Sequence, residues 1–432
     1  MERTKKVLIE GIVLFAIFFT GCGDGENKPS GDADLDTSDE NEGEDLIGEE
    51  IQEILPDQPM EESEIEFDGI EIFDADSVEE ELPPPPPPLA ITTNASFDYS
   101  SGSYSIVNIE TMEVSRNVMT IHSDALPKCL GGRFFVLERF GADTVTLVDN
   151  KSPFNILSQY SVEAGSNPVD MDLLSEETGI VTRNNLTRPA IISLVDGSLN
   201  TEAIDLSNFA DSDGIPEASA VKVIEGKIFI ALQLLDRGTP LWDPTGPGKV
   251  VVLNSENFDL IDVNPATPQE DLIVLSGANP LVPFYESPVD TSRILIAEVG
   301  FYGQTDGGIE GIDVNTYEKT GFIITEEVLG GDISAWVVVD EHTGYAAISK
   351  LNYAGDKIVR FDPSSGRVTR DSIIESGPFT LTGMALTRDG KLLVVSRDLN
   401  NPGIYIIDAN TGNVITSSPV DTGTPPFAIC AL

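Results

Sequence analysis

Short apolar runs that end at an Asp or Asn recur along residues 89–432 of the chain. The clearest copy reads Ile-Tyr-Ile-Ile-Asp-Ala-Asn-Thr-Gly-Asn-Val, residues 404–414. Seven copies occur, centred on Asn108, Asp149, Asp196, Asn254, Asp313, Asp362 and Asp408. A side-chain oxygen of Asp or Asn accepts backbone N–H groups one or two residues on, which closes a turn between strands. Short strands that repeat every 41 to 59 residues predict an all-β, seven-bladed β-propeller for residues 89–432.

Each corner is expected between the third and fourth strands of a blade. The third repeat then has strands at 169–174, 179–183, 190–195 and 202–206, and the seventh has them at 380–386, 391–396, 403–407 and 414–418. One strand, 427–432, remains after the seventh blade, whereas the first corner is preceded by a single extra strand, 89–96. This count predicts that the C-terminal strand supplies the inner strand of the N-terminal blade, a closure that leaves no free sheet edge.

Three segments carry a resemblance to a known repeat. Gly165-Ser-Asn-Pro-Val169 and Gly277-Ala-Asn-Pro280 precede inner strands, and Leu386-Thr-Arg-Asp-Gly390 is followed by Lys-Leu-Leu-Val-Val395. These segments resemble the YVTN-type propeller repeat, which has Gly-x-x-Pro before the inner strand and a Pro-Asp-Gly-like turn after it. The resemblance implies a seven-bladed propeller, often at a cell surface or in the periplasm. It does not imply one chemistry.

Residues 1–22 have the pattern of an export signal. Arg3, Lys5 and Lys6 precede an apolar run over 7–19, which is too short as a helix to span a bilayer core. The segment ends Phe19-Thr-Gly-Cys22, which resembles the lipobox of bacterial lipoproteins. The resemblance implies that Cys22 is diacylated, with palmitate as an expected chain, and anchors the protein to a membrane. Gly23 favours the outer membrane or cell surface of a two-membrane bacterium. The alternative is an ordinary secretory signal with an incidental Cys.

Residues 23–82 are expected to form a tether between the lipid anchor and the propeller. Residues 24–82 hold 25 acidic residues and one basic residue, Lys28, and few large apolar ones. Such a segment cannot bury enough apolar surface to fold, so we expect an acidic, disordered linker that its own charge extends. The six prolines at 83–88 predict a polyproline II rod of roughly 19 Å between the linker and the propeller.

The propeller itself is acidic, with 21 basic and 46 acidic residues over 89–432. This balance argues against binding nucleic acid through phosphate attraction. We expect a monomer that needs no cofactor. Divalent cations suit such a surface, and Asp211 and Asp213 could ligate Ca²⁺, although the loop lacks the acidic twelfth position of an EF-hand.

Signals for catalysis are few. The two histidines, His122 and His342, fall in different repeats, and no Cys-x-x-Cys-His, phosphate-loop or Gly-x-Ser-x-Gly motif is present. Asp170 and Asp172 share one inner strand, where they could serve a lactonase-like site in the channel or, as we expect, a structural role. The favoured function is therefore a surface-displayed binding or scaffold protein. The alternative is a secreted lactonase or other hydrolase.

Four long loops, 207–218, 235–248, 264–280 and 298–308, are expected to cluster on one face. Trp242 and Tyr302 on these loops either form a binding surface or pin the loops down. Four cations occupy matching positions at the ends of second strands: Arg139, Arg183, Lys350 and Arg397. They predict a basic rim that binds an anionic glycan, an acidic segment of a partner protein or this protein's own linker, unless each cation pairs with an acidic neighbour.

Two cysteines, Cys129 and Cys430, fall on inner strands of neighbouring blades. Because an exported domain meets an oxidising compartment, they are candidates for a disulfide. Two buried thiols are the alternative.

Overall fold

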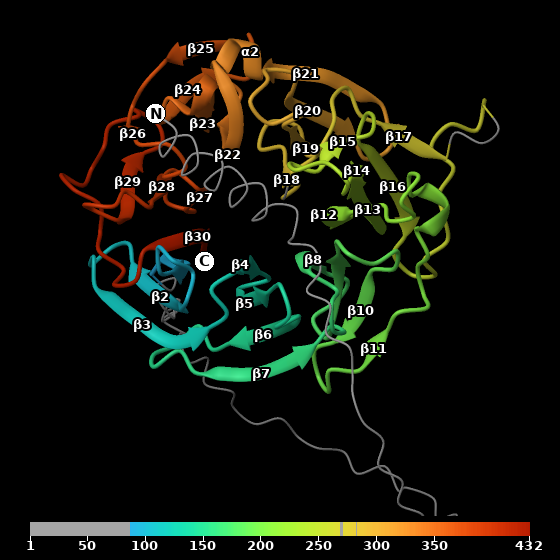
Figure 1. The fold of residues 1–432 in the computed structure, drawn as a ribbon, viewed down its shortest axis with the longest axis horizontal. Helices are drawn as coiled ribbons and strands as arrows, with labels where there is room; N and C mark the ends of the chain where they lie inside the picture. Colours follow the sequence, from blue (N-terminus) through green and yellow to red (C-terminus); the bar gives the residue numbers. More distant parts are fainter. Residues whose placement is uncertain (1–86, 268–270, 282) are drawn as a thin grey trace, which may run out of the picture. The chain divides into compact units, whose positions relative to one another are not determined.

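The computed structural model describes residues 87–267, 271–281 and 283–432. The expectations for residues 1–86, which include the signal peptide with Cys22, the acidic linker and most of the proline run, lie outside these ranges. The described residues form a seven-bladed β-propeller, in which seven sheets surround a central channel (Figure 1). The predicted fold class is confirmed.

The closing, second and third blades are built mainly from the first part of the described chain. In each blade the strands run from the innermost to the outermost in the order named. The closing blade consists of β30 (Pro426–Ala431), β1 (Leu89–Ala95), β2 (Gly102–Asn108) and β3 (Val114–Ile121). The second blade consists of β4 (Ala125–Leu130), β5 (Arg133–Glu138), β6 (Thr144–Val148) and β7 (Ile156–Ser161). The third consists of β8 (Pro168–Leu173), β9 (Thr178–Arg183), β10 (Ala190–Ser193) and β11 (Leu199–Asn200).

The remaining four blades continue around the ring in sequence order. The fourth has β12 (Ala218–Ile224), β13 (Lys227–Leu232), β16 (Lys249–Asn254) and β17 (Leu272–Val274), and the fifth has β18 (Tyr285–Glu286), β19 (Arg293–Glu298), β20 (Gly308–Asp313) and β21 (Lys319–Thr325). The sixth has β22 (Gly331–Asp340), β23 (Thr343–Lys350), β24 (Asp356–Asp362) and β25 (Arg367–Arg370), with β26 (Glu375–Ser376) also on β24. The seventh has β27 (Gly383–Leu386), β28 (Lys391–Ser396) and β29 (Gly403–Asp408).

Four short elements lie between these strands. They are η1 (Ser207–Phe209), the hairpin of β14 (Leu235–Asp236) and β15 (Asp243–Pro244), α2 (Glu326–Leu329) and η2 (Leu351–Tyr353). The hairpin stands within the long loop expected over 235–248. None of the helices among the described residues is long and apolar enough to cross a membrane.

The ring is closed by the two ends of the domain, as the strand count predicts. β30 pairs antiparallel with β1, with Ala90 opposite Ala431 and Thr92 opposite Ile429. Leu89 and Leu432 exchange backbone hydrogen bonds, and Ala95 N donates to Pro425 O at 2.9 Å. In Figure 1 the red β30 lies at the centre of the ring beside the blue strands of the closing blade.

The core is divided among the blade interfaces. Seven apolar clusters each join two neighbouring sheets, for example Ile180 of β9 with Ile228 and Ile230 of β13. A sheet covered on both faces has middle strands that are apolar at nearly every position, as in Lys-Ile-Phe-Ile-Ala-Leu of β13. Outer strands alternate instead, because one face reaches solvent; β7, Ile-Leu-Ser-Gln-Tyr-Ser, is the clearest case.

All seven predicted Asx corners form. In each, the side-chain Oδ1 accepts the backbone N–H two residues on, at 2.8–3.1 Å: Asn108, Asp149, Asp196, Asn254, Asp313, Asp362 and Asp408. The corner between the third and fourth strands is therefore fixed by local chemistry that the sequence shows directly.

Three strand predictions are wrong in their bounds. β11 lies at Leu199–Asn200, not at 202–206. No strand forms over 414–418. That segment meets β29 through the bridge between Ile407 and Val414, and Ile415 N–H donates to Ile406 O at 2.8 Å while Thr416 Oγ1 accepts the N–H of Ile406. β27 starts at Gly383, not at 380, because the N–H groups of Thr380 and Leu381 donate to the carboxylate of Asp356 instead.

Candidate functional site

A cavity of about 1080 Å³ that could take a ligand lies along the central channel. Its lining runs the length of the inner strands, for example from Leu126 to Leu130 of β4 and from Phe427 to Ala431 of β30. Most lining side chains are apolar, including Leu281, Val337, Met384 and Ile429. A largely apolar cavity with a few polar groups is the usual form of a small-molecule site.

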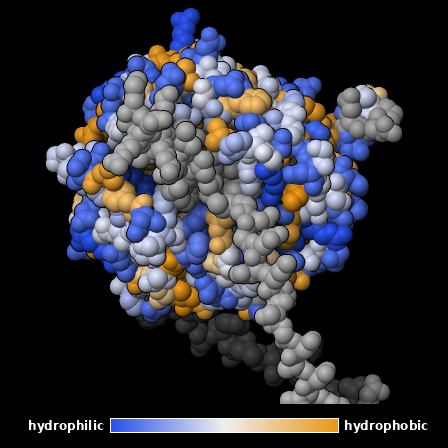
Figure 2. Space-filling model, viewed as in Figure 1, coloured by the Kyte–Doolittle hydropathy of each residue, from blue (hydrophilic) through white to orange (hydrophobic). Residues whose placement is uncertain are grey.

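Outside the channel, hydrophobic side chains are dispersed. On the face seen in Figure 2, hydrophobic and hydrophilic residues are interspersed over the visible blades. The large apolar side chains that are exposed, such as Leu157, Val195 and Val289, belong to different blades. Scattered exposure of this kind is normal for a soluble surface and marks no site.

Ion pairs join the inner strands on one side of the channel. Lys128 of β4 pairs with Asp170 of β8, whose other oxygen accepts the N–H of Val221 at 3.0 Å. Burial raises the pKa of Asp170, and the Lys128 ammonium opposes that rise. Lys222 of β12 likewise lies 3.5 Å from Asp172 and 2.7 Å from Glu286. These carboxylates connect neighbouring blades, which is the structural role expected for Asp170 and Asp172.

An aromatic pair lies on the wall formed by β18 and β22. Tyr285 and Trp336 both line the cavity and meet edge to face, with ring centroids 4.8 Å apart. Trp336 is 2% exposed, and its Nε1–H meets no acceptor among the residues that the structure describes. A buried donor without an acceptor costs free energy. Because this Nε1 is enclosed, Trp336 contributes an apolar aromatic surface to the cavity wall.

Arg397 follows β28 and is the one predicted rim cation that has no carboxylate partner within the described chain. Its Nη1 donates to the carbonyl oxygens of Ala95, Pro425 and Pro426 at 3.1–3.3 Å. Its guanidinium carbon lies 5.2–5.7 Å from the rings of Phe97, Tyr99 and Phe427. Arg397 lines the cavity although it is 5% exposed, and burial lowers the pKa of its guanidinium.

The other three rim cations have internal partners. Arg139 pairs with buried Asp124, Arg183 pairs with Glu163, and Lys350 lies 3.4 Å from Glu375. Arg139 and Arg183 are also buried, so only Lys350 is accessible as a rim cation should be. These contacts are the ones that the alternative of internal pairing expects. Anion binding by the full set stays a prediction. The Arg→Glu variants of Arg183 or Arg397 would bury a carboxylate, so they would perturb folding as well as binding.

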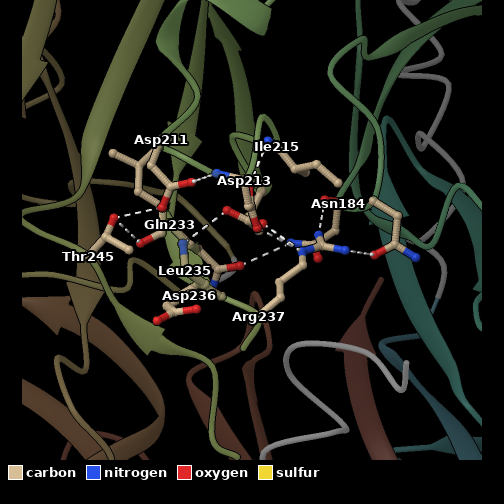
Figure 3. Close-up of polar contacts among 12 residues, drawn as sticks. Asn184, Asp211, Asp213, Ile215, Gln233, Leu235, Asp236, Arg237 and Thr245 are labelled. Atoms are coloured by element: carbon tan, nitrogen blue, oxygen red, sulfur yellow. Dashed lines mark hydrogen bonds and ion pairs between the residues drawn. The ribbon is translucent and has the colours of Figure 1, made fainter. Parts of the chain in front are cut away.

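Two of the long loops meet in one polar network, shown in Figure 3. Arg237 Nε lies 2.7 Å from Glu217 Oε1 and 3.9 Å from Asp213 Oδ2, and its guanidinium stacks 4.6 Å from the Trp242 ring. Burial raises the pKa of Glu217 to about 7, against the opposing effect of Leu235 N–H and Arg237. Trp242 thus supports the Arg237 side chain, as the loop-pinning alternative expects; its role in binding stays a prediction.

Asp211 and Asp213 lie in the same network. Asp211 accepts hydrogen bonds from the N–H of Asp213 and from Thr245 Oγ1, and Asp213 accepts one from the N–H of Ile215 (Figure 3). Over the described ranges, no group of three or more His, Cys, Asp or Glu side chains could hold a metal ion. Calcium at this loop therefore has no support from the geometry.

Tyr302 lies in the loop that follows β19. Its ring is half-buried, its hydroxyl is enclosed, and burial raises the pKa of that hydroxyl. The neighbouring Gly303 N–H donates to Asp332 Oδ2 at 2.6 Å, which ties the loop to β22. Ligand binding by Tyr302 stays a prediction.

Cys129 and Cys430 are joined as a disulfide between β4 and β30. Their Cα atoms are 5.8 Å apart, within the range that a disulfide requires. The bond connects the second blade to the C-terminal strand. Oxidation of this pair in the isolated protein is a prediction that a mass measurement checks.

No sequence motif marks Trp336 or Tyr285. The only signal for them is their place on inner strands, because inner strands line the channel of a propeller. Arg397 looks equivalent to the other three rim cations in the sequence, since position in a repeat does not show which neighbour a side chain meets.

Comparisons with known proteins support the fold. No protein-family model and no curated protein matches this chain. Among solved structures, a protein from Lactobacillus plantarum is 12% identical and has a TM-score of 0.56, over 80% of this chain and 99% of its own. A proposed 6-phosphogluconolactonase from Bacteroides uniformis is 13% identical with a TM-score of 0.54, over 80% of this chain and 100% of its own. A second, from Bacteroides fragilis, is 15% identical with a TM-score of 0.51, over 80% and 98%. At these identities the similarity shows the propeller fold alone.

Proposed function

We propose that the protein is a lipid-anchored binding protein of the bacterial cell envelope and that its propeller takes a ligand in the central channel. The observation that carries the proposal is the 1080 Å³ cavity along the central channel, which is lined mostly by apolar side chains. Apolar side chains around the cavity supply affinity, and a few polar groups orient the ligand.

Binding is favoured over hydrolysis because the acidic groups of the inner strands are already engaged. Asp170 and Glu286 line the cavity and pair with Lys128 and Lys222. A hydrolase needs a base or nucleophile that is free to reach the substrate. Turnover of any member of a lactone and ester panel by the purified protein, abolished by Asp170→Asn, would support the lactonase-like alternative and overturn this choice.

The channel is tested with a neutral, apolar fluorescent probe, 1-pyrenebutanol. We expect the full mature chain to bind one equivalent, with a fluorescence change and an increase in Tm. Ala335→Phe places a ring into the cavity wall and should weaken the probe's binding at least tenfold. Val195→Phe adds the same group to an exposed site, 67% accessible in the wild type, and should leave binding unchanged. Equal binding by the wild type and Ala335→Phe would place the probe elsewhere and refute the channel as the site.

The anchor rests on the resemblance of residues 19–22 to a lipobox. We expect wild-type protein to fractionate with membranes and to incorporate labelled palmitate, and Cys22→Ser to lose the label. If the wild type and Cys22→Ser are both exported, are both recovered in the soluble fraction and carry the same amount of label, the lipid anchor is contradicted. The acidic tether and the proline rod then act as a spacer that holds the propeller away from the membrane surface.

A further inference from the structure

Arg397 is a buried cation in the channel wall, and no carboxylate of the described residues forms an ion pair with it. The other charged residues that line the cavity are mostly paired: Lys128 with Asp170, Arg139 with Asp124, and Glu286 with Lys222. Asp398 follows Arg397 in the chain and also lines the cavity. Its Oδ1 accepts the N–H of Asn400 at 2.9 Å, and it makes no ion pair with Arg397.

The groups around Arg397 are polar or polarisable but uncharged. Carbonyl oxygens of Ala95, Pro425 and Pro426 surround Nη1, and Nη2 lies 3.5 Å from Ser96 O. The guanidinium also shares a hydrogen bond with the Tyr99 side chain. Three aromatic rings enclose the rest of the guanidinium, which is a favourable cation–π arrangement. The partial charges of these groups reduce the desolvation free energy of burying the cation, but they do not neutralise its charge.

Arg397 also has a structural role, which does not account for its charge. Its Nη1 bonds connect the seventh blade to both strands that close the ring, β1 and β30. Neutral donors can satisfy carbonyl acceptors equally well, at no cost in buried charge. The planar fork is instead suited to a carboxylate, because two of its N–H groups can bind both oxygens at once.

We propose that the ligand of the channel is an apolar carboxylic acid, whose hydrocarbon or aromatic body packs along the inner strands and whose carboxylate binds Arg397. The inference rests on the proposed function, and it adds the chemical class of the ligand. The apolar body contacts residues such as Leu126, Met384 and Ile429, while the rings of Phe97, Tyr99 and Phe427 exclude water from the ion pair. A carboxylate at this point would restore the charge balance of the wall.

The test compares two probes that differ in one group, 1-pyrenebutyrate and 1-pyrenebutanol, by titration calorimetry on the full mature chain. A hydrogen bond to a charged group is worth enough to favour the acid roughly tenfold to a hundredfold. Equal affinity for the two probes would overturn the carboxylate inference and leave the channel as a binding site. If the protein binds neither probe, the proposed function itself is overturned.

Variants at Arg397 separate the charge from the closure of the ring. Arg397→Gln should remove the preference for the acid and leave the affinity for the alcohol within about twofold, whereas Arg397→Lys should retain part of the preference. Arg188→Gln, which removes a cation paired with Glu202 and Asp205 on another part of the ring, is the matched control and should bind as wild type. Retention of the full preference by a folded Arg397→Gln protein would overturn the inference. If that variant melts early, the comparison of the two probes on the wild type still decides.

Discussion

Replacing Glu298 by Gln tests the acidic pair at the end of β19. The Glu298 side chain is fully buried, and one of its oxygens accepts the N–H of Gly277. Glu310 of β20 is buried beside it, and its oxygens accept the N–H and the hydroxyl of Ser276. The pKa of Glu298 is raised to about 9, mainly by burial and also by the charge and hydrogen bond of Glu310, against the opposing Gly277 N–H. The Glu298 carboxyl therefore keeps its proton at neutral pH.

The sign of the effect on stability follows from which state holds that proton. Below the unfolded pKa of about 4.5, both states are protonated and the group costs nothing. As pH rises from there to the folded pKa, the unfolded chain releases the proton while the folded domain keeps it. The free energy of unfolding therefore falls by about 1.4 kcal/mol for each pH unit through this one group. Between pH 5.5 and 7.5 the loss amounts to about 2.7 kcal/mol, a large share of the 5–15 kcal/mol typical of a domain.

The amide of Glu298→Gln has the shape of the protonated acid and needs no proton from solvent. Its NH₂ can donate to Glu310, and its carbonyl can accept from Gly277 N–H. We expect the free energy of unfolding of the variant to increase relative to that of the wild type by roughly 1 kcal/mol per pH unit between pH 5.5 and 7.5. The assay is urea unfolding at pH 5.5, 6.5 and 7.5, with Glu318→Gln as the control because Glu318 is exposed on the same blade. Parallel stability curves for the wild type and Glu298→Gln would refute the raised pKa of Glu298.

Three further expectations concern the closure of the ring and its loops. Deleting residues 426–432 removes β30, including buried Phe427 and Ile429 at about 1.5–3 kcal/mol each and the disulfide at about 2–4 kcal/mol; we expect an unfolded domain by circular dichroism, and a cooperative melt near that of the wild type would contradict the closure. Alkylation of the mature propeller without reductant should block neither Cys129 nor Cys430; mass spectrometry that finds both alkylated would contradict the bond. Arg237→Gln leaves buried Glu217 without its cation and should lower stability by about 3 kcal/mol, which Glu217→Gln in the same chain should partly restore; additive losses in the double variant would show that the pair is not coupled.

Local chemistry made much of the fold predictable. An Asp or Asn at the end of an apolar run binds the N–H two residues on, so each of the seven corners could be located without knowing what the strand packs against. Counting strands between corners then required the C-terminal strand to join the N-terminal blade. A strand boundary was predicted wrongly where a side chain of another blade competed for the backbone. Asp356 accepts the N–H groups of Thr380 and Leu381, which would otherwise have extended β27.

The candidate site depended on tertiary structure. Arg139, Arg183, Lys350 and Arg397 occupy equivalent places in their repeats, yet three of them meet a carboxylate and Arg397 meets carbonyls and rings. Trp336 lies on an apolar strand like many others, and only the closed ring places it in the wall of a cavity. The sequence determined the turns and strand order because these rest on interactions between residues a few positions apart. Only the closed ring decided which charges are paired and which donors lack acceptors, because those partners lie up to about 300 residues away in the chain.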